Sequence, residues 1–141
     1  MTTRVEQMLS LYQCFVWCNT MKNYYYASIS NTDIEPNKLK DQIQSFMVYW
    51  YAGLWVVIEG WVHLQNQEVH DSRIDALIQE KEKTKLLRDF RNSVMHYQDE
   101  FYEKRFLNML TSGQQNVDWI CGLHEEFVRF FNNTMLRKKE S

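Results

Sequence analysis

Residues that break helices are scarce in this chain of 141 residues, which has one proline and four glycines. Such low counts exclude a collagen-like chain and a turn-rich β-sandwich. Cysteine is also rare, and an odd total of three argues against the disulfide scaffold of a secreted protein. We therefore expect a cytoplasmic protein, long enough to bury a core without disulfides or a structural metal.

Strong net charge and long apolar runs are missing as well. The formal net charge is −2, so the sequence does not indicate a strongly basic surface that would bind nucleic acid. The most apolar run, residues 46–58, ends at Glu59 and falls short of the roughly 20 residues that cross a bilayer. The N-terminal segment lacks the apolar centre of a signal peptide. We expect neither export nor contact with a membrane.

Apolar and aromatic residues make up 45% and 15% of the chain, and they recur at helical spacing almost everywhere. Pro36 lies in the clearest loop and suits the first turn of the helix that follows. No segment shows the alternating pattern of a strand. Two long helices are expected at about residues 3–28 and 37–67. A short helix follows a cap at residue 71 or 72, another helix begins at residue 81, and the last covers residues 117–131. Residues 1–141 are therefore predicted to form one all-α domain, an up-and-down bundle of four to six helices.

The second predicted helix is apolar on much of its circumference, as in helices at the centre of a bundle or at a subunit interface. We expect its aromatic residues Trp50, Tyr51 and Trp55 to line an interface between two copies. A pocket that stacks a ring ligand is a second interpretation of the same residues. Gly53 and Gly60 lie near one face of this helix and would let another helix approach closely.

Cysteine and histidine spacing gives no complete metal site. Cys14 and Cys18 share a helix face, but a structural zinc ion needs four ligands, so we expect both to be buried hydrophobes. Glu59 and His63 also share a face, which suits either two metal ligands or an acid–base pair. Because Glu59 interrupts an apolar helix, we expect a specific cationic partner such as Arg91.

The other histidines outside residues 86–97, including His124, are expected to be solvated or capping residues. His124 is followed by two glutamates, but the second histidine of a zinc-protease motif is absent.

Residues 86–97 carry the most specific motif of the chain. Arg91 is followed by Asn92 and, four residues after that, by His96. The asparagine and the fixed spacing make a chance match rare. The motif resembles the signature of HEPN domains, all-α domains that place it late in the bundle, after a helix with a Leu-Leu-x-x-Phe face that is also present here. A looser resemblance extends over residues 40–131, and the order of helices there is similar to that of a small bacterial family.

The resemblance implies a metal-independent endoribonuclease, or an RNA-binding protein, of a bacterial toxin–antitoxin or defence system. RNA and an antitoxin protein are its implied partners, and no metal or cofactor is implied. In this role His96 is the general base or acid, Arg91 holds the phosphate and Asn92 orients either group. Some HEPN toxins carry a tyrosine two residues after the histidine, where this chain has Gln98.

The resemblance also implies a homodimer, because HEPN domains gather the arginine and histidine of both copies in one cleft. Residues five apart are about 140° apart around a regular helix, so Arg91 and His96 do not share a face. Convergence needs the long arginine side chain, a break in the helix or a second copy. Four further residues are assigned by position, Lys85 and Arg88 to RNA binding and Glu59 and Tyr97 to support of the site.

Two interpretations from other classes stay open. The chain is either a non-enzymatic helical dimerisation and interaction module or a small-ligand binder with an aromatic pocket. A pocket lined by Trp50, Tyr51 or Trp55 but distant from His96 would favour the ligand binder. In both cases Arg91 would be structural, tying helices together through Glu59 or Asp89.

Overall fold

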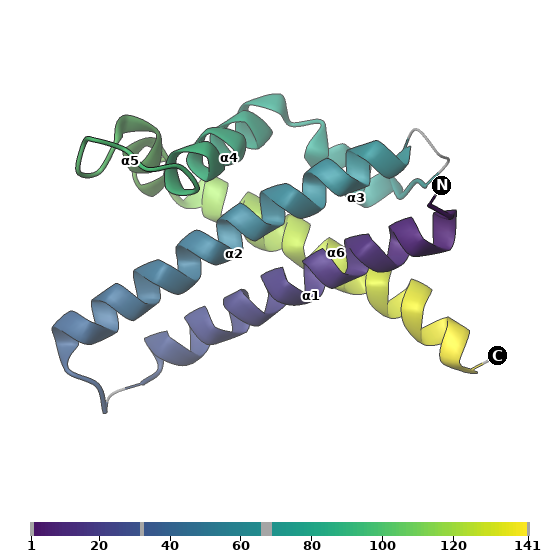
Figure 1. Cartoon of the computed structure of the whole chain (residues 1–141), viewed down its shortest axis with the longest axis horizontal. Helices are drawn as coiled ribbons and strands as arrows, with labels where there is room; N and C mark the ends of the chain where they lie inside the picture. Colours follow the sequence, from purple (N-terminus) through teal and green to yellow (C-terminus); the bar gives the residue numbers. More distant parts are fainter. Residues whose placement is uncertain (1, 32, 66–68, 141) are drawn as a thin grey trace.

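A computed structural model describes residues 2–31, 33–65 and 69–140, with side chains as far as residue 135. This part of the chain is helical, without strands, and its six helices form a bundle (Figure 1). They are α1 (Arg4–Ile29), α2 (Pro36–Gln65), α3 (Ser72–Ile78), α4 (Lys81–Val94), α5 (Lys104–Leu110) and α6 (Gln114–Glu140). The predicted all-α bundle of four to six helices is confirmed. No helix within the described ranges has the length and hydrophobicity to cross a membrane.

Most helix boundaries follow from local chemistry. Thr3 and Glu6 form a reciprocal capping box at the start of α1. The second helix begins at Pro36, as predicted, while its predicted end at residue 67 lies outside the described residues. Asp71 caps α3 by accepting hydrogen bonds from the backbone N–H groups of Arg73 and Ile74.

Helices α1 and α2 run antiparallel and side by side (Figure 1). Small residues allow this close packing. A Cβ atom added at Gly60 would come within 2.7 Å of Leu11 Cδ1, and one added at Gly53 within 3.3 Å of Cys18 Cβ. The expected role of both glycines in close helix approach is confirmed.

The last helix, α6, crosses behind the α1–α2 hairpin (Figure 1) and closes the core with aromatic side chains. Phe131 stacks on Phe15 of α1 with 5.0 Å between ring centroids. Trp61 of α2 meets Phe127 edge to face at 5.7 Å. Such contacts add about 0.5–1.5 kcal/mol each beyond the burial of apolar area.

The short helix α3 is tied to its neighbours by polar contacts. Trp61 Nε1 donates to Asp75 Oδ1 at 2.8 Å, and Trp119 Nε1 donates to the carbonyl oxygen of Leu77 at 2.9 Å. Arg129 of α6 bonds Asp71 at 2.8 Å. These contacts hold α3 against the C-terminal part of α2 and the stretch of α6 between Trp119 and Arg129.

Two of the expected interface residues belong to the core of the single chain. Trp50 is 1% exposed and Tyr51 6%. Tyr51 packs edge to face against Phe90 of α4. The prediction that Trp50 and Tyr51 line an interface between copies is wrong, because α1, α4 and α6 of the same chain already cover them. Trp55 is half-buried and keeps part of its ring on the surface.

Candidate functional site

The motif residues Arg91 and His96 are separated by the end of a helix. α4 ends at Val94, and His96 lies in the exposed segment that leads to α5. Arg91 lines a groove between α1 and α2, whereas His96 lines a different pocket with Ser93 and Glu103. The break in the helix therefore does not bring the two side chains together within one chain.

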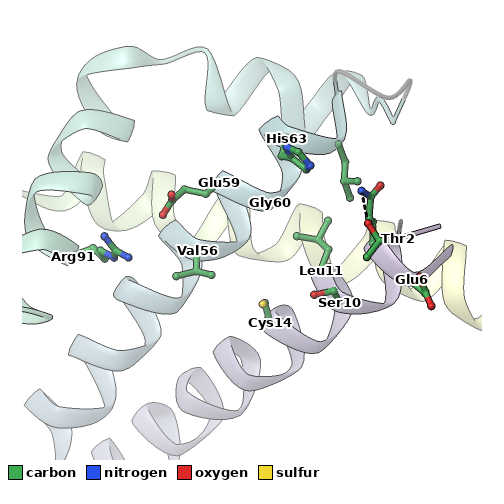
Figure 2. A pocket seen from close by; sticks show the side chains of 12 residues that line it. Thr2, Glu6, Ser10, Leu11, Cys14, Val56, Glu59, Gly60, His63 and Arg91 are labelled. Carbon is green, nitrogen blue, oxygen red and sulfur yellow. Dashed lines mark hydrogen bonds between the residues drawn. The ribbon is translucent and has the colours of Figure 1, made fainter. Parts of the chain in front are cut away.

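The groove that holds Arg91 has a volume of about 550 Å³. Glu59 and His63 project into it from consecutive turns of α2, and Arg91 projects from α4 (Figure 2). Leu11, Cys14 and other residues of α1 form the opposite wall. One side of the groove therefore combines a carboxylate, an imidazole and a guanidinium, which are the group types needed for acid–base work on a phosphate ester.

Arg91 makes one side-chain hydrogen bond, from Nη1 to Oδ1 of Asn92 at 2.9 Å. Its Nε is buried and has no partner among the described atoms. No ion pair in the described part of the chain includes Arg91 or Glu59. The expected ion pair between these residues is therefore wrong. Glu59 is exposed and stays solvated, so it needs no partner.

The surroundings of His96 are acidic. Its pocket also contains Glu100 and Glu103. Glu103 accepts a hydrogen bond from Ser93 at 2.7 Å and pairs with Arg105 at 2.8 Å. The hydrogen bond from Ser93, opposed by desolvation and aided by Arg105, lowers the pKa of Glu103. This carboxylate is therefore ionised at neutral pH and would repel a phosphate unless a cation from elsewhere joined it.

Tyr97 is 89% exposed and contributes to none of the described pockets that hold Arg91 or His96. The structure therefore places it away from the motif side chains that it was expected to support.

A third pocket, of about 350 Å³, lies between α2, the end of α3 and the first half of α4. Lys81, Lys85 and Arg88 of α4 line it, and Trp55 of α2 forms part of the wall. The two predicted RNA-binding residues are thus brought together with an aromatic ring. This pocket does not contain His96, which is the arrangement expected of a small-ligand binder.

His124 is the polar residue that the sequence prediction missed. It is fully buried, not solvated. Trp50 Nε1 donates to His124 Nδ1 at 3.1 Å, and Nε2 lies 2.9 Å from Asn19 Oδ1. An indole can only donate, so the proton of the neutral ring is on Nε2. Burial, aided by Lys22, lowers the pKa of His124 to about 4.

The helical spacing does contain a signal for the burial of His124. It lies four residues after Ile120 and three before Phe127, on the stripe of α6 that faces the core. A histidine on such a stripe is expected to have hydrogen-bond partners from neighbouring helices.

The cysteines lie in separate environments. Cys18 is buried beside His124, and burial raises its pKa far above the ordinary range of a thiol. Cys14 lines the Arg91 groove, and Cys121 lies 3.7 Å from the hydroxyl of Tyr26. Among the residues searched, which are those the structure describes, no three His, Cys, Asp or Glu side chains gather closely enough to hold a metal ion.

Comparison with protein-family models, with curated proteins and with solved structures finds no match to this chain. The resemblance to HEPN domains therefore rests on the Arg91–Asn92–His96 motif and the helical context.

Proposed function

We propose that this protein binds and cleaves RNA without a metal ion, as a HEPN-like homodimer of a toxin–antitoxin or defence system. The observation that carries the proposal is the state of Arg91. It is a partly buried guanidinium in a groove, with a buried Nε that lacks a partner and no carboxylate in ion-pair range in the described structure. A phosphate in the groove would supply the opposite charge that the guanidinium lacks.

The reaction uses the nucleophile that RNA itself carries. A base takes the proton of a 2′-hydroxyl, whose oxygen attacks the adjacent phosphorus, and an acid gives a proton to the leaving 5′-oxygen. The products are a 2′,3′-cyclic phosphate and a 5′-hydroxyl. Arg91 stabilises the charge on the phosphorane, and its hydrogen bond to Asn92 orients the guanidinium.

In this proposal the proton-transfer group is His96 of a second copy. Within one chain the two residues line separate pockets, so a shared cleft requires two-fold symmetry. Exposed apolar residues next to His96 support such an association. Phe101 is 87% exposed, and Tyr102 and Leu110 border an apolar groove of about 840 Å³.

The test is cleavage of a fluorescent single-stranded RNA by the purified protein in the presence of a chelator. We expect cleavage by the wild type, and loss of at least a hundredfold in Arg91→Gln and in His96→Gln. Mixing the two inactive variants should restore about a quarter of the activity, because half of the dimers are mixed and one of the two Arg91–His96 pairs in their cleft is intact.

His63→Gln is the matched comparison, because His63 shares the Arg91 groove within the same chain. If His63→Gln abolishes cleavage while His96→Gln does not, the shared cleft is contradicted. If neither histidine variant changes the rate, or the wild type leaves the RNA intact, the proposed ribonuclease is contradicted.

A second candidate is a helical interaction module without enzymatic activity. The specific observation in its favour is the exposure of Phe101, whose ring centroid lies 4.2 Å from that of Tyr102 at the apolar groove. A module of this kind would form dimers that Phe101→Ser disrupts, measured by analytical ultracentrifugation, while RNA cleavage stays absent in the wild type.

A further inference from the structure

The pocket between α2 and α4 that Trp55 lines differs in charge from the rest of the protein. Its lining includes Lys81, Lys85 and Arg88 and no carboxylate, although the chain as a whole carries a net charge of −2. The pocket with Arg91 contains Glu6 and Glu59, and that of His96 contains Glu100 and Glu103. Among the pockets the structure describes, this one has the largest number of cationic side chains.

Helix geometry fixes the relative positions of the three cationic side chains. Lys81, Lys85 and Arg88 follow at intervals of four and three residues, so they project from one face of α4. Asp89 lies 3.7 Å from Lys85 and 3.6 Å from Arg88, beyond the length of a charge-assisted hydrogen bond. The cationic groups therefore retain donors for another anion.

The backbone at the start of α4 offers further donors, alongside the carboxylates of Glu80, which pairs with Lys83, and of Glu82. Its N-cap residue, Glu80, makes no side-chain hydrogen bond to the first turn. The backbone amides of a helix N-terminus carry partial positive charge, and here they begin at Lys81, which is itself part of the pocket.

The opposite wall of the pocket is apolar and aromatic. Trp55, Ile58 and Val62 of α2 form it. Trp55 is half-buried, so its ring is held by the core yet retains an exposed face. Indole rings stack on any nucleobase, and a ring that is already fixed loses little conformational entropy when a ligand binds. The volume, about 350 Å³, lies at the lower end of the range of small-molecule sites.

We propose that this pocket binds a nucleotide unit, with the base on Trp55 and the phosphate on Lys81, Lys85 and Arg88. The inference deepens the proposed function and rests on it for the identity of the ligand as RNA. Arg91 lies one helical turn after Arg88. A strand seated in the Trp55 pocket would thus continue toward the groove where Arg91 holds the scissile phosphate.

The test is calorimetric titration of the full chain with four probes: a nucleoside monophosphate, the same nucleoside, inorganic phosphate and a short single-stranded RNA. We expect the monophosphate to bind at least tenfold more tightly than the nucleoside or phosphate alone, because it engages both walls. If the RNA binds even more tightly than the monophosphate, the pocket is a subsite for a strand. Equal affinity for RNA and monophosphate identifies a site for free nucleotides. Both results support the pocket.

Matched variants separate the pocket from the surface. Trp55→Leu should weaken binding of the monophosphate about tenfold, whereas Trp17→Leu, which removes an exposed ring on α1, should not. The double variant Lys85→Gln/Arg88→Gln changes exposed side chains and covers the case in which Trp55→Leu fails to fold. Its control is Lys38→Gln, an exposed residue at the start of α2.

Two results would overturn the inference: equal binding by the Trp55→Leu and Trp17→Leu variants, or a nucleoside that binds as tightly as its monophosphate. Cleavage of RNA that survives the loss of Trp55, Lys85 and Arg88 would reject this pocket and leave the proposed ribonuclease intact. Nucleotide binding that depends on Trp55, in a protein that leaves RNA uncut, would reject the ribonuclease and leave the pocket intact.

Discussion

Trp50 donates its indole N–H to Nδ1 of His124 across 3.1 Å in the centre of the bundle. This contact joins α2 to α6, and the bond from His124 Nε2 to Asn19 extends the chain of hydrogen bonds to α1. All polar atoms of the imidazole are therefore satisfied only when the ring is neutral, because Nδ1 must accept. Protonation of His124 would break the contact with Trp50.

The buried imidazole predicts loss of stability in mild acid. The pKa of His124 is about 4 in the folded chain, against an ordinary value of 6.5. The unfolded chain therefore binds more protons between these two values, and stability falls as the pH drops through that window. The loss reaches roughly 3 kcal/mol at pH 4 and then levels off. Urea denaturation at a series of pH values measures it.

His124→Gln is the control for this prediction, because glutamine can accept from Trp50 and donate to Asn19 without titrating. The stability of this variant should change less than that of the wild type between pH 6.5 and 4. The carboxylates of Asp71, Glu103 and Glu125 have lowered pKa values and lose stabilisation below about pH 5, equally in wild type and variant. Equal slopes for wild type and variant in that window would show that His124 is not the acid-sensitive group.

Two helical glycines are predicted to respond differently to alanine. A methyl group at Gly122 of α6 would meet no atom within 4 Å, whereas one at Gly53 of α2 would lie 3.3 Å from Cys18 Cβ. Alanine in a helix is favoured over glycine by about 1 kcal/mol. Gly122→Ala should therefore stabilise the protein by about that amount. Gly53→Ala should gain less or lose stability, because the buried Cys18 must move. Thermal unfolding of both variants provides the measurement, and an equal gain would contradict it.

The helices themselves followed from local signals in the sequence. Pro36 and the Asp71 cap lie where their chemistry predicts a helix start, and apolar spacing alone indicated the core stripes of α2 and α6. The burial of Trp50 and Tyr51 did not follow, since periodicity shows which face is apolar but not which neighbour covers it. Which helices cover these two residues depends on long-range packing, in which α6 crosses the α1–α2 hairpin.

The candidate site was predictable only in part. The sequence placed Lys85 and Arg88 on one helix, but their meeting with Trp55 depends on how α4 lies across α2. The predicted ion pair of Glu59 was wrong for a related reason. A carboxylate within an apolar run can still point to solvent where it lines an open groove, as Glu59 does.

The ion pair between Asp71 and Arg129 predicts a graded loss of stability. Asp71 both caps α3 and accepts from Arg129 Nη2 at 2.8 Å. Burial opposes ionisation of Asp71, but the bonds from Arg129 and the backbone outweigh it and lower its pKa. Asp71→Asn keeps a capping side chain and should cost about 1 kcal/mol. Asp71→Ala removes the cap as well and should cost about 1 kcal/mol more. Chemical denaturation at pH 7 would rank the variants, and equal costs would contradict a capping contribution.

Arg91 predicts a change in the salt dependence of RNA binding that a purely structural residue would not produce. Each phosphate contact made by a cation releases condensed counterions, so the affinity for a single strand falls with salt with a slope of about −0.7 per contact. Arg91→Gln should make the slope shallower by about that amount. The matched control Lys38→Gln, at the exposed start of α2, should leave the slope unchanged. Fluorescence anisotropy with a labelled oligonucleotide between 50 and 200 mM salt, roughly the range over which such slopes are defined, is the measurement. Because the guanidinium of Arg91 has no ion-pair partner in the described structure, its removal frees no carboxylate that would itself repel RNA. A slope that stays the same in Arg91→Gln would therefore mean that this arginine does not contact phosphate.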